Sequence, residues 1–203
     1  NNSTRINLQK YHSNIFDVEG YDVILFSEEN VNCKRLVKDS IPLLTEPICW
    51  AVNKNHPLAG RESIKLSELK QERFVVPSRE FFSRLRIEEK LDEVLPDFDD
   101  NVVFYSNSPV SVMTFIENDV ASSFVPAISW QFLRSDRISL IPVEDWSTQR
   151  TIYLYSQDES VKREEIDRFI AYSKRYIEEL VKTRLSDFPG LRKMETEGKI
   201  QYR

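Results

Sequence analysis

The chain has 203 residues, of which 40% are hydrophobic and 30% are charged, and its formal net charge is −5. This composition indicates one large or two small folded domains and excludes disordered and fibrous proteins. The negative charge, with no compact basic stripe, argues against nucleic-acid binding by this chain alone. Apolar runs such as Val23–Phe26 and Ile48–Val52 are far shorter than the ~20 residues of a membrane-spanning helix. We therefore expect no membrane partner.

Motifs that would indicate chemistry are missing. The two cysteines, Cys33 and Cys49, form no CxxC pair or Cys/His cluster. Two free thiols in a reducing, cytoplasmic compartment are expected, and a disulfide between them is the open alternative. The sequence contains neither GxGxxG nor GxxxxGK[ST]. It has no Ser-His-Asp arrangement and no metal-ligand spacing, so we expect no enzyme activity, no metal and no cofactor.

The N-terminal third predicts strands. Residues 5–11 alternate apolar and polar side chains, as in a half-buried strand. Residues 21–27 form a nearly continuous apolar run, which is typical of a strand covered on both faces. Residues 41–45 and 48–53 predict two strands that Pro47 interrupts, because proline cannot donate to a strand ladder.

Strands and helices alternate after this point. Residues 66–69 predict one helical turn. Ser78 and Ser108 are candidate helix N-caps, and Pro109 occupies the preferred first helical position. A third, short helix is expected at 128–133. Further strands are predicted at 73–77, 101–105, 121–125, 138–143 and 151–155.

The C-terminal region contains the clearest helical pattern. From Ser160 on, apolar residues follow the i, i+3, i+4, i+7 spacing of an amphipathic helix. The tail after Asp187 is expected to be an appendix of uncertain order. The alternation along the whole chain predicts an α/β fold with mostly parallel sheets and right-handed crossovers.

Four stretches, in this order, resemble the effector-binding domain of LysR-type transcriptional regulators over roughly residues 5–182. They are YDVILFSEE from Tyr21, EPICWAVNKNHPLAGRESIKLSELKQERFVV from Glu46, SNSPVSVMTFIENDVASSFVP from Ser106, and RTIYLYSQDE from Arg150. One departure concerns the family's Gly-x-Gly, which aligns with Asp119-Val120-Ala121. Because glycine tolerates positive φ, its loss predicts a slightly different turn there.

The resemblance implies an α/β, type 2 periplasmic-binding-protein-like fold, in which two crossover strands join two Rossmann-like subdomains. Residues 1–61 and 148–203 would form subdomain I, with a tail at the C-terminus, and residues 62–147 would form subdomain II. A small-molecule effector would bind in the cleft between them. It would modulate DNA binding and transcription through a winged helix-turn-helix outside this chain. The resemblance also implies a homodimer or tetramer.

A solute-binding protein of a transport system is the alternative function on the same fold. It differs from a regulator in needing export from the cytoplasm and in having no attached helix-turn-helix. The regulator would contact DNA only through its N-terminal domain, which the resemblance places, with the first strand and helix of subdomain I, before Asn1.

Two strand-to-helix loops carry candidate effector-binding residues. Ser106, Asn107 and Ser108 precede a predicted helix, where free backbone N–H groups and the helix dipole favour a carboxylate. Simple capping by Ser108 is the open alternative. Ser78 and Arg79 have the same topology, and Arg79 would either pair with an anionic effector or lie in solvent.

Ser27, Glu28 and Thr45 lie at the ends of predicted strands of subdomain I, so the resemblance implies that they face the same cleft. An inward-pointing Glu28 would prefer an amine or a hydroxyl group. Together with Arg79 it would require a zwitterionic effector, unless only one of the two belongs to the site. A surface position for Glu28 is the alternative. The expected effector is therefore a small carboxylate or a zwitterion.

His56 lies in the sequence His-Pro-Leu-Ala, directly after a predicted strand. Catalysis and metal binding would each need partner residues that the sequence does not place beside it. Pro57 restricts the backbone of His56 and fixes the direction in which the chain leaves the strand. We therefore expect His56 to be a structural residue of the turn.

Overall fold

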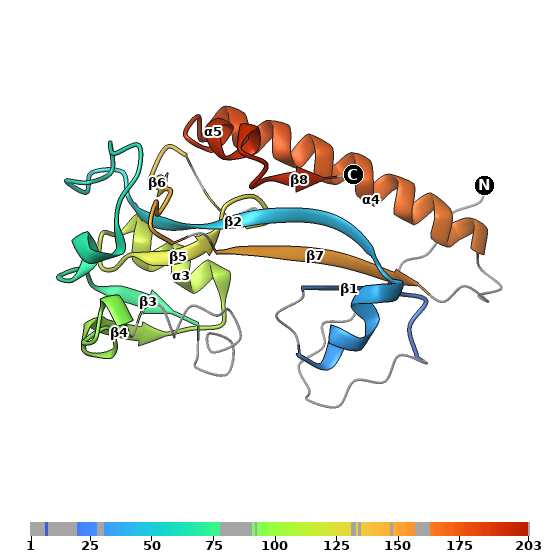
Figure 1. Cartoon of the computed structure of the whole chain (residues 1–203), viewed down its shortest axis with the longest axis horizontal. Helices are drawn as coiled ribbons and strands as arrows, with labels where there is room; N and C mark the ends of the chain where they lie inside the picture. The colour runs from blue at the N-terminus through green and yellow to red at the C-terminus, as the bar shows by residue number, and fades with distance from the viewer. Residues whose placement is uncertain are drawn as a thin grey trace.

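Two long antiparallel strands, β2 (Ile41–Asn53) and β7 (Gln149–Ser156), run side by side through the molecule (Figure 1). The computed structural model describes residues 7, 20–27, 31–77, 91, 93–130, 133, 135–146, 148–156 and 163–202, except the side chains of 31–34. Of the strand predicted at 5–11 only residue 7 is described. Of the helix predicted after Ser78 only the end is described, where residues 91, 93 and 94 are helical.

A six-stranded sheet is built on β2. The N-terminal half of β2 pairs with β7 and with β8 (Gln201–Tyr202), and its C-terminal half pairs with β5 (Ser123–Pro126) and β6 (Ile138–Ile141). All of these pairs are antiparallel, as is the pairing of β1 (Val23–Ser27) with β7. The parallel pair is β3 (Phe74–Val76) with β4 (Val102–Tyr105).

The prediction of mostly parallel sheets is therefore wrong for the described strands. Antiparallel pairing of β2 and β7 follows from the chain's path, because β2 leads into the region of β3 to β6 and β7 leads back from it. The alternation of strands and helices in the sequence does not reveal this return, since it reports the order of elements and not their direction in space.

The expected break at Pro47 does not occur, and β2 is a single strand of 13 residues. Pro47 lies opposite Gln149, and its carbonyl oxygen accepts a hydrogen bond of 3.1 Å from the backbone N–H of Ala127. A proline disrupts a strand only where the ladder needs its missing N–H. Here the neighbouring Ile48 N–H donates instead, to the carbonyl oxygen of Thr148 at 2.9 Å.

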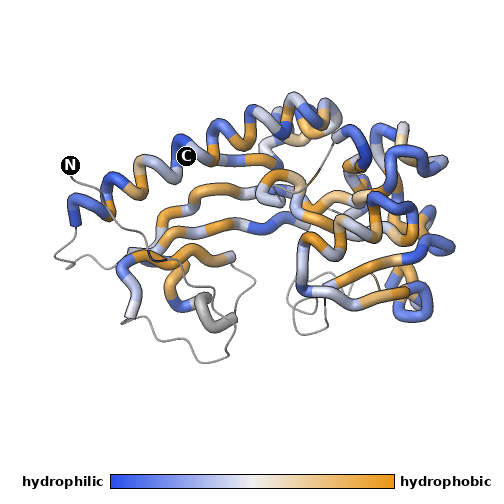
Figure 2. The backbone as a smooth tube through the Cα atoms, turned by 180° about the vertical axis from the view of Figure 1, so that it is seen from behind, coloured by the Kyte–Doolittle hydropathy of each residue, from blue (hydrophilic) through white to orange (hydrophobic). Residues whose placement is uncertain are grey.

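Helix α4 (Arg163–Asp187), with 25 residues, lies along β2 and β7. In Figure 2 its hydropathy alternates along the tube, as expected for an amphipathic helix with one face on the core. The apolar face carries the buried residues Ile166, Ile170, Val181 and Leu185. Other helices in the described part of the chain are α3 (Pro109–Glu117), α5 (Leu191–Thr196), η1 (Val31–Asp39), η2 (Leu66–Leu69) and η4 (Asp99–Asn101).

Three other local predictions differ from the structure. In β1, Ile24 and Phe26 are buried while Leu25 is 52% exposed, so this strand is covered on one face. Residues 127–129 form a turn where a helix was expected. The tail is ordered in α5 and β8, because its apolar side chains join the core. Among the described residues, no helix has both the length and the apolar character needed to span a bilayer.

Helix α3 has the predicted N-terminus and an unexpected C-terminus. Ser108 Oγ accepts from the Ser111 N–H at 3.4 Å, and Pro109 is the first helical residue. At the other end, Val120 N–H donates to Phe115 O and Asp119 N–H to Ile116 O, both at 3.0 Å. This is the pattern of a Schellman motif, whose left-handed residue is usually glycine.

Asp119 is that left-handed residue, with a φ of 56°, and no other described non-glycine residue has a positive φ. The loss of glycine at this position therefore does not remove the left-handed conformation. Asp is among the few residues other than glycine that adopt it, because its short polar side chain can form local hydrogen bonds.

We expect Asp119→Gly to raise the free energy of unfolding by about 0.5–1 kcal/mol, because it relieves the steric cost of a Cβ at positive φ. Asp119→Val should lower it by more than that, since a β-branched residue fits this conformation poorly. Urea denaturation of the two variants and of the unchanged chain measures both effects. Equal stability of the glycine and valine variants would contradict a left-handed Asp119.

Candidate functional site

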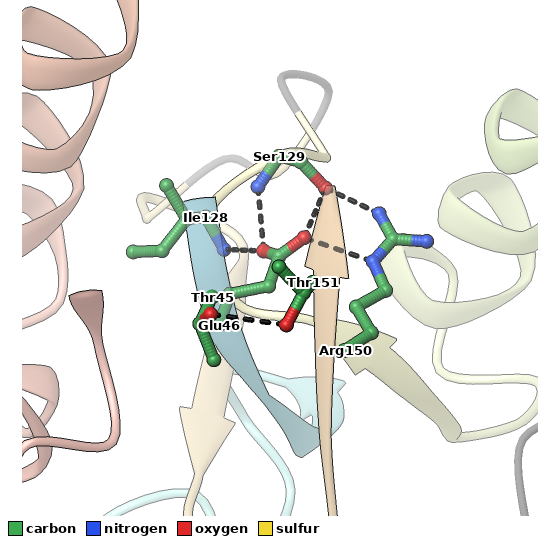
Figure 3. Close-up of polar contacts among 6 residues, drawn as sticks. All are labelled: Thr45, Glu46, Ile128, Ser129, Arg150 and Thr151. Atoms are coloured by element: carbon green, nitrogen blue, oxygen red, sulfur yellow. Dashed lines mark hydrogen bonds and ion pairs between the residues drawn. The ribbon is translucent and has the colours of Figure 1, made fainter. Parts of the chain in front are cut away.

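The two crossover strands present different side chains on their two faces. Thr45 of β2 lies opposite Thr151 of β7, and their hydroxyl oxygens are 3.0 Å apart (Figure 3). Side chains alternate along a strand, so this pair shares its face with Tyr153. Tyr153 in turn stacks on Phe26 of β1, with ring centroids 5.6 Å apart. The threonine pair is thus a polar site on the face of the sheet that carries Phe26 and Tyr153 and that packs against η1.

The opposite face carries an ion pair whose carboxylate is buried and whose guanidinium is partly buried. Glu46 is fully buried, and its carboxylate accepts from the backbone N–H groups of Ile128 at 2.7 Å and Ser129 at 2.8 Å. It also accepts from Ser129 Oγ at 2.6 Å and from Arg150 Nε at 2.9 Å. Arg150 Nη2 donates to Ser129 Oγ (Figure 3). A buried charge is tolerated only when it is paired and hydrogen-bonded in this way.

We call Glu46, Ser129 and Arg150 the junction cluster, because they join β2, β7 and the turn that follows β5. From the sequence, Glu46 was noted only as the first residue of a stretch that resembles the family, and the junction cluster was not predicted. Its partners lie 82 to 104 residues away in the chain. The available signal was an acidic residue inside an otherwise apolar strand, which rarely occurs unless the charge has a partner.

The loop before α3 is shaped by its own serines. Ser106 N–H donates to Val76 O at 2.9 Å, and Ser106 Oγ accepts from Ser108 N–H at 3.1 Å. Because β3 and β4 are parallel, the loops that follow them leave from the same edge of the sheet. Ser106 Oγ accepts from Ser108 N–H, and Ser108 Oγ accepts from Ser111 N–H. Each hydroxyl acts as an acceptor in these bonds and retains its O–H as a donor. Ser108 and Asn107 are exposed.

The structure separates some of the other candidates. Ser27 of β1 lies opposite Ile152 of β7, which is the residue next to Thr151. Because successive side chains of a strand point to opposite faces, Ser27 lies on the opposite face of the sheet from Thr45 and Thr151. Glu28, Ser78 and Arg79 lie outside the described residues. Pro77, the last described residue before Ser78, follows the carboxyl end of β3.

His56 has the contacts of a structural turn residue. Its Nδ1 accepts from Leu58 N–H at 3.2 Å, and its Nε2 is 3.2 Å from Glu72 Oε2. Its ring packs edge-on against Trp50. In the described part of the chain, no three His, Cys, Asp or Glu residues gather as a metal site would require.

Cys49 does not have the properties of a reactive thiol. It is free, fully buried and 4.0 Å from the sulfur of Met194. Burial raises the pKa of its thiol to about 12, and the nearby Glu46 carboxylate acts in the same direction. The nucleophilic form of cysteine is the thiolate. Cys49 therefore stays protonated near neutral pH and behaves as a small apolar side chain.

The chain is similar in sequence to known proteins. One curated relative is an uncharacterized HTH-type transcriptional regulator, YybE of Bacillus subtilis, 28% identical over 112 residues. The match covers 55% of this chain and 37% of that protein, so the chain spans well under half of the relative's length.

Several solved structures have a similar fold. The effector-binding domain of QuiR in complex with shikimate has a TM-score of 0.56 at 18% identity, covering 79% of this chain and 74% of that one. The Synechocystis CcmR regulatory domain in complex with 2-PG has a TM-score of 0.56 at 17% identity, covering 75% and 74%. A mutant OxyR of Corynebacterium glutamicum has a TM-score of 0.54 at 21% identity, covering 83% and 52%.

These likenesses support the expected fold, a type 2 periplasmic-binding-protein-like α/β domain with two crossover strands. The model of the LysR substrate binding domain matches residues 19–178. That match includes both crossover strands, the junction cluster and the Ser106–Ser108 loop, and it covers most of the chain. The chain therefore belongs to the LysR substrate-binding-domain family.

Proposed function

We propose that this chain is the ligand-sensing domain of a LysR-type transcriptional regulator and that it binds a small-molecule effector between two subdomains. The family match carries the proposal. The QuiR and CcmR structures contain small molecules, shikimate and 2-PG, which supports the same kind of use here. The family's role is ligand binding in transcriptional regulators and not catalysis, so neither an enzyme nor a transport protein is favoured.

The proposed effector contacts are the loop residues Ser106, Asn107 and Ser108 together with Ser78 and Arg79. Free hydroxyl donors at the N-terminus of α3, where the helix dipole is positive, support a carboxylate or zwitterionic effector. The exposure of Ser108 and Asn107 leaves them accessible to a ligand.

On the crossover strands, Thr45 remains a proposed contact and gains Thr151 as a partner. Glu28 remains a proposed contact for an amine or a hydroxyl group of the effector. Ser27 is the least favoured member of the set, because the register puts its side chain on the opposite face from Thr45.

The proposed subdomain boundaries are 1–61, 62–147 and 148–203. Strand pairing favours the second boundary, because β7 starts at Gln149 and returns to the part of the sheet that contains β1. At the first boundary, β2 changes partners between Pro47 and Ile48, so pairing favours an earlier division there. The whole regulator would act as a homodimer or tetramer in the cytoplasm and contact DNA through a separate helix-turn-helix domain.

A thermal-shift and calorimetric screen of small carboxylates and zwitterions tests the proposal. A ligand at 100 times its dissociation constant should stabilise the chain by about 2.7 kcal/mol, which corresponds to a rise in Tm of roughly 5–11 °C at this size. Ser106→Ala and Thr45→Val should each weaken binding, whereas Ser186→Ala on the exposed face of α4 should not. Failure to find any ligand, or a ligand that binds all three variants equally, would contradict the proposed site.

A further inference from the structure

The last described residues fold back onto the crossover strands. We call Phe188–Tyr202 the strap. Its strand β8 pairs with β2, with Tyr202 opposite Leu44 and Gln201 opposite Thr45. Its Lys199 carbonyl oxygen accepts a hydrogen bond of 3.1 Å from Gln149 Nε2, at the start of β7. The strap thus contacts both crossover strands at the place where they pair with each other (Figure 1).

The strap has one firmly anchored part and one weakly attached part. Leu191 is fully buried, and Met194 and Ile200 are 7% and 4% exposed, all in the same core cluster as Cys49. In contrast, β8 has only two residues, which pair with Leu44 and Thr45 of β2. Short elements held by few hydrogen bonds open at a small fraction of the free energy of global unfolding. Tyr202 of β8 is partly buried against the same core cluster and donates to Glu195 Oε1 of α5 at 3.2 Å. We therefore expect β8 to separate from β2 at a lower free energy than α5 needs to leave the core.

Thr45 connects the strap to the rest of the crossover. Its backbone pairs with Gln201, and its side chain bonds Thr151 of β7. The next residue, Glu46, belongs to the junction cluster, which holds β2 against β7 and the turn after β5. A change in the attachment of β8 therefore acts on the residue at which these strands are fixed to one another.

We propose that the strap is a built-in conformational clamp. With β8 attached, β2 and β7 keep one relative position, and with β8 detached they adopt others, so that the strap biases the arrangement of the two subdomains. This inference rests on the proposed function, in which that arrangement is the signal. An effector that contacts Thr45 would shift the attachment of β8 only through different affinities for the two states.

The clamp is tested without any ligand, so its failure is distinguishable from failure of the proposed effector site. In a Cys33→Ser background, spin labels are placed at Lys38→Cys on η1 and at Val110→Cys on α3, both exposed positions. Cys49 is buried and stays unlabelled. Double electron–electron resonance then measures the distribution of distances between the two labels.

Ending the chain after Ile200 removes β8 and keeps α5 with its buried anchors, and Gln149→Ala removes the contact to Lys199. Each change should shift or broaden the distance distribution, whereas the exposed Lys193→Ala on α5 should leave it unchanged. Hydrogen exchange of β7 amides, which do not pair with β8, should accelerate about tenfold or more while α3 amides keep their rates. An unchanged distance distribution, or equal acceleration in β7 and α3, would overturn the clamp.

Discussion

Replacing Glu46 with alanine should lower the free energy of unfolding by about 3–5 kcal/mol, because it leaves the partly buried Arg150 without its counter-charge and two backbone N–H groups without their acceptor. The guanidinium of Arg150 would lose its carboxylate at 2.9 Å, and Ile128 N–H and Ser129 N–H would lose their acceptor. For a chain of this length the loss corresponds to a fall in Tm of roughly 6–20 °C. Urea denaturation and thermal unfolding measure the two quantities.

The matched control is Glu62→Ala, which removes an exposed carboxylate and should change stability by less than about 0.5 kcal/mol. Arg150→Ala and the double variant complete a cycle that isolates the interaction between Glu46 and Arg150. The double variant should be less destabilised than the sum of the single changes, since each single change already breaks the same pair. A loss below 1 kcal/mol for Glu46→Ala would contradict the geometry of the junction cluster.

Local sequence rules predicted the elements whose causes are local. The start of α3 depends on Ser108 and Pro109, which are adjacent in the chain, and both occupy the expected cap positions. The buried face of α4 was predicted for the same reason, because its apolar spacing repeats over many turns. Such features depend on residues within a few positions of one another, so a single sequence contains the information that determines them.

The errors concern features that distant residues determine. Pro47 looked like a strand breaker, but the neighbouring strands do not need its missing N–H. The tail was expected to be an appendix, but Leu191 and Ile200 are buried in the core, and β8 pairs with β2. Direction of pairing, burial of a short tail and the partners of Glu46 all depend on contacts across the fold. Periodicity and composition do not encode these contacts in a form that one sequence reveals.

Candidate ligand groups were predictable where topology alone positions them. A serine-rich loop between a strand and a helix presents donors whichever way the domain packs, so Ser106 and Ser108 could be proposed from sequence. Thr151 could not, because its proximity to Thr45 depends on the register of β2 against β7. A one-residue slip would have placed the two threonines on opposite faces.

Arg184 is, with Glu46, a buried charged residue of the described part of the chain, and its loss should be costly. It is 5% exposed on α4, and its Nη1 and Nη2 donate to the carbonyl oxygens of Leu133 at 2.8 Å and Trp130 at 3.0 Å. Burial lowers the pKa of its guanidinium, and the Asp187 carboxylate, 3.8 Å away, opposes that shift. The two carbonyl bonds attach α4 to the segment that follows the turn of the junction cluster.

Arg184→Met should lower the free energy of unfolding by about 2–4 kcal/mol, because it removes both charge-assisted hydrogen bonds while keeping most of the side-chain volume. The carbonyl oxygen of Leu133 would lose its donor, whereas that of Trp130 would keep the backbone N–H of Leu133 at 3.1 Å. Arg184→Lys should recover part of that loss, since an ammonium can reach one carbonyl but lacks the planar fork that bonds both. Arg175→Met, at an exposed position of the same helix, is the control and should change stability by less than about 0.5 kcal/mol. Equal stability of the lysine and methionine variants would show that the guanidinium bonds to Trp130 and Leu133 do not stabilise the packing of α4 against that segment. In that case the segment would be held against α4 by apolar packing.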